Sequence, residues 1–145
     1  MEYKILGNIG TILRTVDSLN IKQIIVSEDT ADVYNPKVVR STMGAIFRVK
    51  IIESEDLVKT VKELKKYKIK VYATDLNTNK KMYDIKEEKR AIIIGNEANG
   101  VSIKMLQNAD ERIKIPMIGK TESLNAAVAT SIILYEMNRD ELKNI

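Results

Sequence analysis

IIIGNEANGVS, at residues 92–102, decides the fold together with RIKIPMIGKTESLNAAVATSIILYE, at residues 112–136. Each stretch begins as an apolar strand, continues into a loop of small and polar residues, and ends in a helix. In open α/β sheets, ligands bind at the carboxyl ends of the strands, where such loops lie. Taken with NIGTILRT at residues 8–15, the two loops predict a nucleotide-type cofactor site that faces one arginine, Arg14.

Strand and helix patterns alternate along the rest of the chain. Strands are expected at residues 23–27, 47–52, 68–74, 91–95 and 112–115, and helices at residues 8–19, 36–44, 55–67, 101–108 and 124–137. Residues 3–6 form only a strand stub, and residues 75–89 are the least regular stretch. The alternation predicts an α/β protein with a mostly parallel sheet covered by helices, in a single domain over residues 1–145.

Polar residues mark the expected starts of three helices. Asn8 is suited to cap the first helix, Ser54 the third and Ser123 the last, because their side-chain oxygens can accept backbone N–H bonds. The last helix carries one apolar stripe at helical spacing, made of Leu124, Val128, Ile132 and Tyr135.

The composition limits the chemistry. The 145 residues contain no cysteine and no histidine, which excludes thiol chemistry and removes the usual general base and zinc ligand. Catalysis must therefore use other side chains or a cofactor, and no metal is expected. There is no signal peptide and no apolar run long enough for a membrane, so a cytoplasmic protein without a membrane partner is expected. The net charge of +4 suits RNA but is equally compatible with other partners.

The loop GNEANG, at residues 95–100, follows a buried strand, and its glycines would let a ligand approach the backbone. It matches neither the phosphate-binding P-loop nor the dinucleotide fingerprint, so by itself an ordinary turn is the commoner explanation. Glu97 is either an acid favoured near a helix start or the partner of a cation such as Arg14, and local sequence slightly favours the first.

The segment at residues 115–125 places apolar side chains beside small polar ones. Ile115, Met117 and Leu124 would suit the faces of a purine, with backbone groups for its edges, although core packing is the commoner fate of such residues. Ser123 is explained by a capping role alone. Asn125 is harder to explain, because asparagine is unfavourable inside a buried helix.

Two basic residues lie near one face of the short helix expected at residues 36–44, and a third follows it. Lys37, Arg40 and Arg48 form either a phosphate-contacting patch or a solvated face. Arg14, considered alone, is an ordinary surface arginine. With one Phe and no Trp in the chain, base stacking is not indicated.

Three motifs in combination resemble the SpoU (TrmH) family of RNA 2′-O-ribose methyltransferases, within the SPOUT superfamily. The motifs are NIGTILRT at residues 8–15, GNEANGVS at 95–102, and IPM at 115–117 followed by SLN at 123–125. The segment NPKVVRSTMGAIFRVKI at residues 35–51 also resembles the family. The resemblance covers essentially the whole chain, and three ordered motifs are far less probable by chance than any one of them.

The resemblance implies an α/β fold with a deep C-terminal trefoil knot, bent S-adenosylmethionine in the knot loops, and a homodimer with active sites near the subunit interface. It implies a catalytic set of Arg14, Asn8, Glu97, Ser123 and Asn125. The implied cofactor contacts are Gly95, Asn96, Gly100, Ile115, Met117, Ser123, Leu124 and Asn125. RNA contacts would come from Arg14, Lys37, Arg40 and Arg48.

The chain departs from the family in two places. Family members normally have a full strand before the first motif, and many have a separate N-terminal RNA-binding domain; this chain is expected to be the catalytic domain alone, with that strand shortened. The third motif also continues with Ala126 and Ala127 where the family usually has Val and Ser. These differences affect fine tuning and substrate affinity more than reaction class.

The predicted reaction is methyl transfer to a ribose 2′-hydroxyl, in ribosomal RNA more than in transfer RNA. Because an arginine stays protonated, Arg14 is expected to hold a phosphate and stabilise the developing alkoxide instead of acting as a base. The alternatives are a non-catalytic RNA-binding or ribosome-assembly protein on the same scaffold, and a relative that methylates a base.

Overall fold

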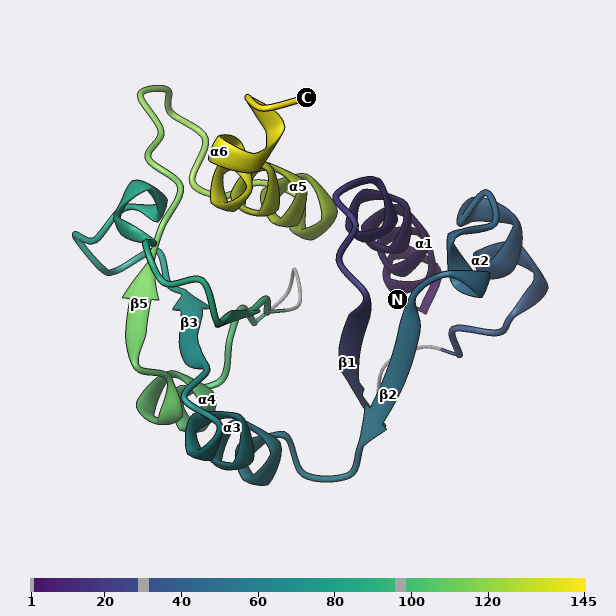
Figure 1. The fold of residues 1–145 in the computed structure, drawn as a ribbon, viewed down its shortest axis with the longest axis horizontal. Coiled ribbons are helices and arrows are strands. Elements are labelled where there is room, and N and C mark those ends of the chain that lie inside the picture. Colours follow the sequence, from purple (N-terminus) through teal and green to yellow (C-terminus); the bar gives the residue numbers. More distant parts are fainter. Residues whose placement is uncertain (1, 29–31, 96–98) are drawn as a thin grey trace.

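The fold alternates strands and helices from end to end (Figure 1). The structure is a computed structural model that describes residues 2–28, 32–95 and 99–145. Its helices are α1 (Glu2–Ser18), α2 (Pro36–Ser41), α3 (Leu57–Lys66), α4 (Ile103–Asn108), α5 (Ala126–Met137) and α6 (Arg139–Leu142). Its strands are β1 (Gln23–Ser27), β2 (Lys50–Ser54), β3 (Lys70–Thr74), β4 (Arg90–Ile93) and β5 (Glu111–Ile113), and the 3₁₀ turns are η1 (Ala45–Phe47) and η2 (Met82–Asp84).

All the paired strands run parallel, which confirms the α/β prediction. β1 pairs with β2 in a register that joins Gln23 to Lys50, and a second sheet has the order β4-β3-β5. The expected single sheet is thus divided into two in the described residues. Ile92 of β4 packs against the buried cluster that surrounds α1, so apolar packing takes the place of a hydrogen-bonded ladder between the sheets. The trefoil knot stays a prediction.

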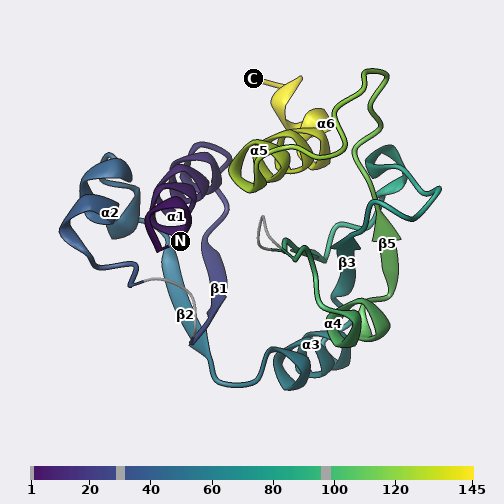
Figure 2. The ribbon, with the colours of Figure 1, turned by 180° about the vertical axis from the view of Figure 1, so that it is seen from behind.

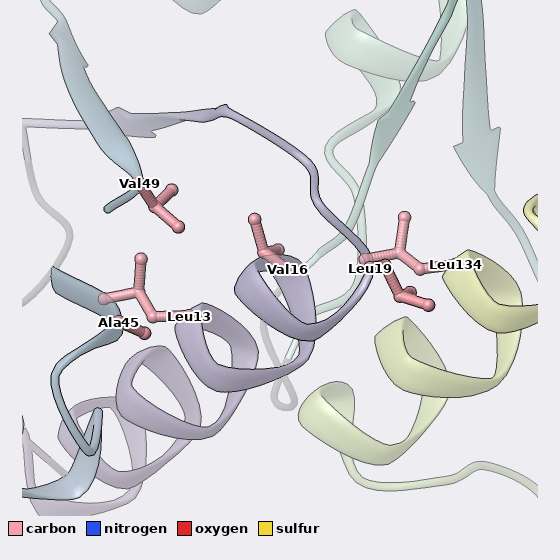
Figure 3. Close-up of a cluster of buried hydrophobic side chains, with 6 residues drawn as sticks. All are labelled: Leu13, Val16, Leu19, Ala45, Val49 and Leu134. Atoms are coloured by element: carbon pink, nitrogen blue, oxygen red, sulfur yellow. The ribbon is translucent and has the colours of Figure 1, made fainter. Parts of the chain in front are cut away.

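The elements are arranged around a ring, with α1 beside α5 at one end and α3 beside α4 at the opposite end (Figures 1 and 2). The first end is held by a buried apolar cluster made of Leu13, Val16, Leu19, Ala45, Val49 and Leu134 (Figure 3). Two further clusters lie around Tyr72 and Val71 of β3. The first cluster therefore joins the amino-terminal third of the chain to its last long helix. None of the described helices is long and apolar enough to cross a membrane.

The start of the chain differs from the prediction. The expected strand at residues 3–6 and the expected cap Asn8 both lie within α1. Glu, Lys and Leu in this stretch favour a helix, and a strand this short needs a paired neighbour. The helix ends as expected, with Asn20 in the left-handed region at a φ of 57°.

Two helix caps were assigned to the wrong residue. Ser54 ends β2, with its hydroxyl 2.6 Å from Thr60 Oγ1, and Asp56 caps α3 by accepting from the Lys59 N–H. Asn125, rather than Ser123, caps α5. In both cases a carboxylate or amide oxygen is the acceptor in place of the serine hydroxyl. The expected strand at residues 47–52 also begins later, at Lys50, because Phe47 ends a 3₁₀ turn.

The apolar stripe of α5 is not its buried face. The buried residues are Ala127, Thr130, Ile133 and Leu134. Val128 is 48% exposed and Tyr135 60% exposed. Because α5 is apolar on nearly every side, the spacing of its apolar residues does not indicate which face packs on the core.

Candidate active site

The loop after β4 is shaped by a close approach of its own backbone. A Cβ added at Gly95 would lie 2.1 Å from the Gly100 carbonyl carbon and 2.2 Å from the Val101 nitrogen. Gly100 has a φ of +64° and open space around it. Gly95 is therefore required by the return of the chain on itself, and Gly100 by its left-handed backbone. The predicted Asn96 and Glu97 lie outside the described residues.

The start of α5 forms the second part of the site. The Oδ1 of Asn125 accepts hydrogen bonds from the Ala127 N–H (2.9 Å) and the Val128 N–H (3.2 Å). This explains the residue that the sequence left unexplained: Asn125 lies at the helix end, where asparagine is favoured. Ser123 and Leu124 precede it on an exposed segment.

The segment between β5 and α5 changes from half-buried to exposed along its length. Ile115 packs against the cluster around Tyr72, whereas Met117 is 37% exposed and Leu124 is 36% exposed. Apolar side chains with solvent-accessible backbone between them suit an adenine ring, whose faces need packing and whose edges need hydrogen bonds. A Cβ added at Gly100 would meet nothing within 4 Å, and residues 117–125 are exposed, so both parts of the candidate site are open to solvent.

Arg14 lies on the exposed side of α1, between buried Leu13 and half-buried Thr15. The Thr15 and Ser131 hydroxyl oxygens are 2.9 Å apart, and the Ser131 hydroxyl also donates to the Ala127 carbonyl at 2.9 Å. The helix that carries Arg14 is thus bonded to the first turns of the helix that Asn125 caps. The hydrogen bond therefore joins Thr15, the last residue of the first motif, to the helix that follows the third motif, and Asn8 lies within α1.

The other face of α1 explains a further residue of the first motif. A Cβ at Gly10 would lie 1.7 Å from Ser41 Oγ and 2.8 Å from Ser41 Cβ. Gly10 therefore permits α2 to pack against α1. Together with the bond to Ser131, this contact holds α1 between α2 and α5.

The predicted basic patch is divided by the structure. Lys37 and Arg40 are exposed on α2. Arg48 instead forms a fork with Asp17 of α1, with Nη2 2.7 Å and Nε 2.9 Å from Oδ2. The hydrogen bond to Arg48 holds the pKa of Asp17 below its usual value. Arg48 is therefore already paired with a carboxylate.

Sequence reasoning missed a polar cluster on β3. Lys70 Nζ lies 2.8 Å from Glu87 Oε1 and 3.0 Å from Glu111 Oε1, and the buried Tyr72 hydroxyl donates to Glu87. Burial raises the pKa of Tyr72 to about 12, and the hydrogen bond from Lys70 lowers that of Glu87 to about 2. These polar groups connect β3 to β5 and to the loop before β4, and none of them is a predicted site residue. The described residues include no acidic cluster able to hold a metal.

Comparison with known proteins gives consistent matches. The family model described as the SpoU rRNA Methylase family matches residues 1–135. A Bacillus subtilis protein named 23S rRNA (guanosine(2553)-2′-O)-methyltransferase RlmP is 36% identical over 132 residues, covering 90% of this chain and 53% of that protein. A putative TrmH family tRNA/rRNA methyltransferase of Staphylococcus epidermidis is 35% identical, with 91% and 53% covered. The chain thus spans about half the length of these curated relatives.

A solved structure with a bound cofactor is similar over nearly the whole chain. The SpoU methyltransferase AviRb of Streptomyces viridochromogenes, in complex with AdoMet, superposes with a TM-score of 0.84 at 35% identity. The match covers 95% of this chain and 57% of that one. A putative RNA methyltransferase of the TrmH family from Porphyromonas gingivalis gives a TM-score of 0.86 at 34% identity, with 93% and 55% covered.

Proposed function

Because this chain belongs to the SpoU rRNA methylase family, we propose that it transfers a methyl group from S-adenosylmethionine to a ribose 2′-hydroxyl of RNA. The observation that carries the proposal is the junction of α1 and α5, which links the helix of Arg14 to the helix capped by Asn125. Ribosomal RNA is the favoured substrate, in keeping with the name of the Bacillus subtilis relative, and transfer RNA is the second choice.

The cofactor would lie between the loop after β4 and the segment before α5. When bound, it supplies an activated methyl group on a sulfonium, so the protein needs to align the acceptor and no metal is required. The adenine ring would pack against the side chains of Ile115, Met117 and Leu124. The backbone of this segment would form hydrogen bonds with the edges of the ring. Gly95 and Gly100 give the first loop its shape, and Asn96 would add a further cofactor contact. AviRb was solved in complex with AdoMet, which supports the choice of cofactor.

Arg14 would act on the acceptor. Its guanidinium stays protonated, so it can grip a neighbouring phosphate and stabilise negative charge that develops on the 2′-oxygen, but it cannot remove the proton. Its exposed position on α1 leaves it accessible to RNA. Ser123 and Asn125 would orient the hydroxyl, and Asn8 and Glu97 would complete the catalytic set. Lys37 and Arg40 would contact phosphates farther along the RNA, and Arg48 would support them from its ion pair with Asp17.

A second copy of the chain would cover the exposed apolar face of α5. Val128 and Tyr135 lie on this face, and a homodimer would remove them from water next to the junction with α1. Residues 1–145 would serve as one catalytic domain. A ribosomal RNA substrate would be met by a cytoplasmic protein, which is the location we propose.

The first experiment is calorimetric titration of the purified protein with S-adenosylmethionine, and with S-adenosylhomocysteine as a second ligand. Saturable binding near one site per chain is expected. A folded protein that binds neither would contradict the methyltransferase proposal and favour the non-catalytic RNA-binding alternative.

The second experiment separates Arg14 from cofactor binding. Arg14→Ala should bind S-adenosylmethionine as the wild type does but lose methyl transfer to ribosomal RNA by orders of magnitude. The matched control is Arg112→Ala, an exposed arginine on β5 whose ion pair is with Asp75. Near-normal turnover of Arg14→Ala would remove this residue from the mechanism.

A further inference from the structure

The only phenylalanine of the chain is one of its most exposed side chains. Phe47 is 85% exposed at the end of η1, and Met43, four residues earlier, is 71% exposed. Single exposed apolar residues are common, but two large ones in one short turn call for an explanation. The candidate active site does not use either of them.

The backbone of this turn is built to hold these two side chains outward. Thr42 and Ala45 are each 1% exposed, and the Thr42 hydroxyl donates to the Val39 carbonyl at 2.8 Å. Between them, Met43 has a φ of 50° and Gly44 a φ of 85°. A left-handed methionine is strained, and such strain tends to persist at functional positions. The core therefore anchors the turn while Met43 and Phe47 face solvent.

Cations lie on the elements that the turn connects. Arg40 lies on the last turn of α2, and Lys22 and Lys50 stand next to each other where β1 and β2 begin, since the Lys50 N–H donates to the Lys22 carbonyl at 2.8 Å. All three are exposed. Asp17 is the acidic residue that forms an ion pair at this end of the sheet, among the described residues. Its charge is already balanced by Arg48.

We propose that Met43, Phe47, Arg40, Lys22 and Lys50 form an RNA-contact surface, in which Phe47 stacks on an unpaired base and the cations contact phosphates. This inference rests on the proposed function, because it concerns the same RNA. Aromatic faces combined with a positive groove are how proteins hold single-stranded nucleic acid. The centre of a protein–protein interface is instead depleted of lysine, which this surface carries at two positions.

The surface is separate from the cofactor loops. It lies at the amino ends of β1 and β2 and beside α2, whereas the candidate site follows β4 and β5 and lies at the start of α5 (Figure 1). It would therefore hold RNA away from the reacting nucleotide and contribute affinity without touching the cofactor.

The absence of tryptophan from the chain permits a direct test of stacking. Phe47→Trp creates a single fluorescent reporter, and Tyr67→Trp creates a matched one at a residue that is 73% exposed at the end of α3. The probes are a twelve-nucleotide oligoadenylate and inorganic polyphosphate, which has the charge but no bases. Oligoadenylate should quench Phe47→Trp, whereas polyphosphate should not, and Tyr67→Trp should be quenched by neither.

Affinity variants provide the second measurement. Phe47→Ala should weaken oligoadenylate binding about tenfold, the size expected for the loss of one stacked base. Phe47→Leu should weaken it similarly, because leucine keeps the apolar bulk but has no aromatic face, and Phe47→Tyr should retain most of it. Tyr67→Ala is the control with unchanged affinity. All four should unfold near the wild-type temperature, because both side chains are largely exposed.

The outcomes separate this proposal from the proposed function. In one outcome, the wild type binds S-adenosylmethionine and RNA, oligoadenylate does not quench Phe47→Trp, and Phe47→Ala binds oligoadenylate normally. The proposed RNA-contact surface is then wrong, and the methyltransferase proposal stands. If the wild type binds neither ligand, both fail. If Phe47→Trp emission changes with protein concentration alone, or Phe47→Ala alters the oligomeric state, the surface contacts another copy of the chain and the RNA proposal is overturned.

Discussion

Of the substitutions Gly95→Ala, Gly100→Ala and Gly119→Ala, the first should lower the stability of the folded protein most. The added Cβ would meet three backbone atoms of Gly100 and Val101 at 2.1, 2.2 and 2.5 Å, each about 1 Å short of ordinary contact. Backbone cannot rotate away as a side chain can, so the loop itself must shift. A forced overlap of this kind costs about 3 kcal/mol. For a domain of this size that corresponds to a melting temperature lowered by about 10 °C.

Two other glycines calibrate the measurement. Gly100→Ala places a methyl group in open space but at a φ of +64°, and should cost about 1 kcal/mol. Gly119→Ala meets nothing within 4 Å, and should change stability by no more than about 0.5 kcal/mol.

In thermal and urea unfolding, Gly95→Ala should therefore be the least stable of the three variants, followed by Gly100→Ala and then Gly119→Ala. Calorimetry with S-adenosylmethionine, performed well below each melting temperature, should show that Gly95→Ala has lost cofactor binding while Gly119→Ala retains it. A Gly95→Ala protein that melts within about 2 °C of the wild type would refute the close approach of the loop to itself, and with it this account of the motif.

Three further predictions concern a helix cap, a hydrogen bond between two helices and an ion pair. Asn125→Ala should lose about 1 kcal/mol of stability in urea unfolding, whereas Asn125→Asp should keep the cap and the stability but lose methyl transfer if the amide orients the hydroxyl. Thr15→Val and Ser131→Ala should each cost about 1 kcal/mol, and the double variant less than their sum, because they remove the same hydrogen bond; full additivity would contradict it. The pKa of Glu87 is lowered from 4.5 to about 2 by its hydrogen bond to Lys70, so its contribution to stability is complete above pH 4.5 and is lost as the pH falls towards 2. Thermal unfolding should therefore show a larger loss over that range for the wild type than for Glu87→Gln, and parallel curves would count against the ion pair.

Local patterns in the sequence were sufficient for most of the elements. β1 occupies the predicted residues 23–27, because a run of β-branched residues between polar loops defines a strand without reference to the rest of the chain. The same holds for α2, which begins at Pro36 as predicted, since proline favours the first helical position. The family assignment also came from the sequence, because it depends on motif order and spacing.

Local patterns were insufficient wherever two candidates of similar chemistry compete. Ser123 and Asn125 are both good caps, and the choice depends on where α5 lies against α1. In α1, residues 3–6 could form a strand or extend the helix, and the absence of a pairing neighbour decides for the helix. The roles of the site residues stay predictions, and Asn96 and Glu97 lie outside the described residues.

The sequence by itself determined the fold class, the family and the glycine-rich loops. The fold class follows from short-range periodicity, and the family from the order and spacing of the motifs. The loops follow from glycines at positions where a side chain would clash or would strain the backbone. Only the tertiary structure decided that Thr15 meets Ser131, that Arg48 is paired with Asp17, which face of α5 is buried, and that Phe47 faces solvent. The physical reason is separation along the chain: Thr15 and Ser131 are 116 residues apart, and burial is set by such long-range contacts, which neighbouring residues do not specify.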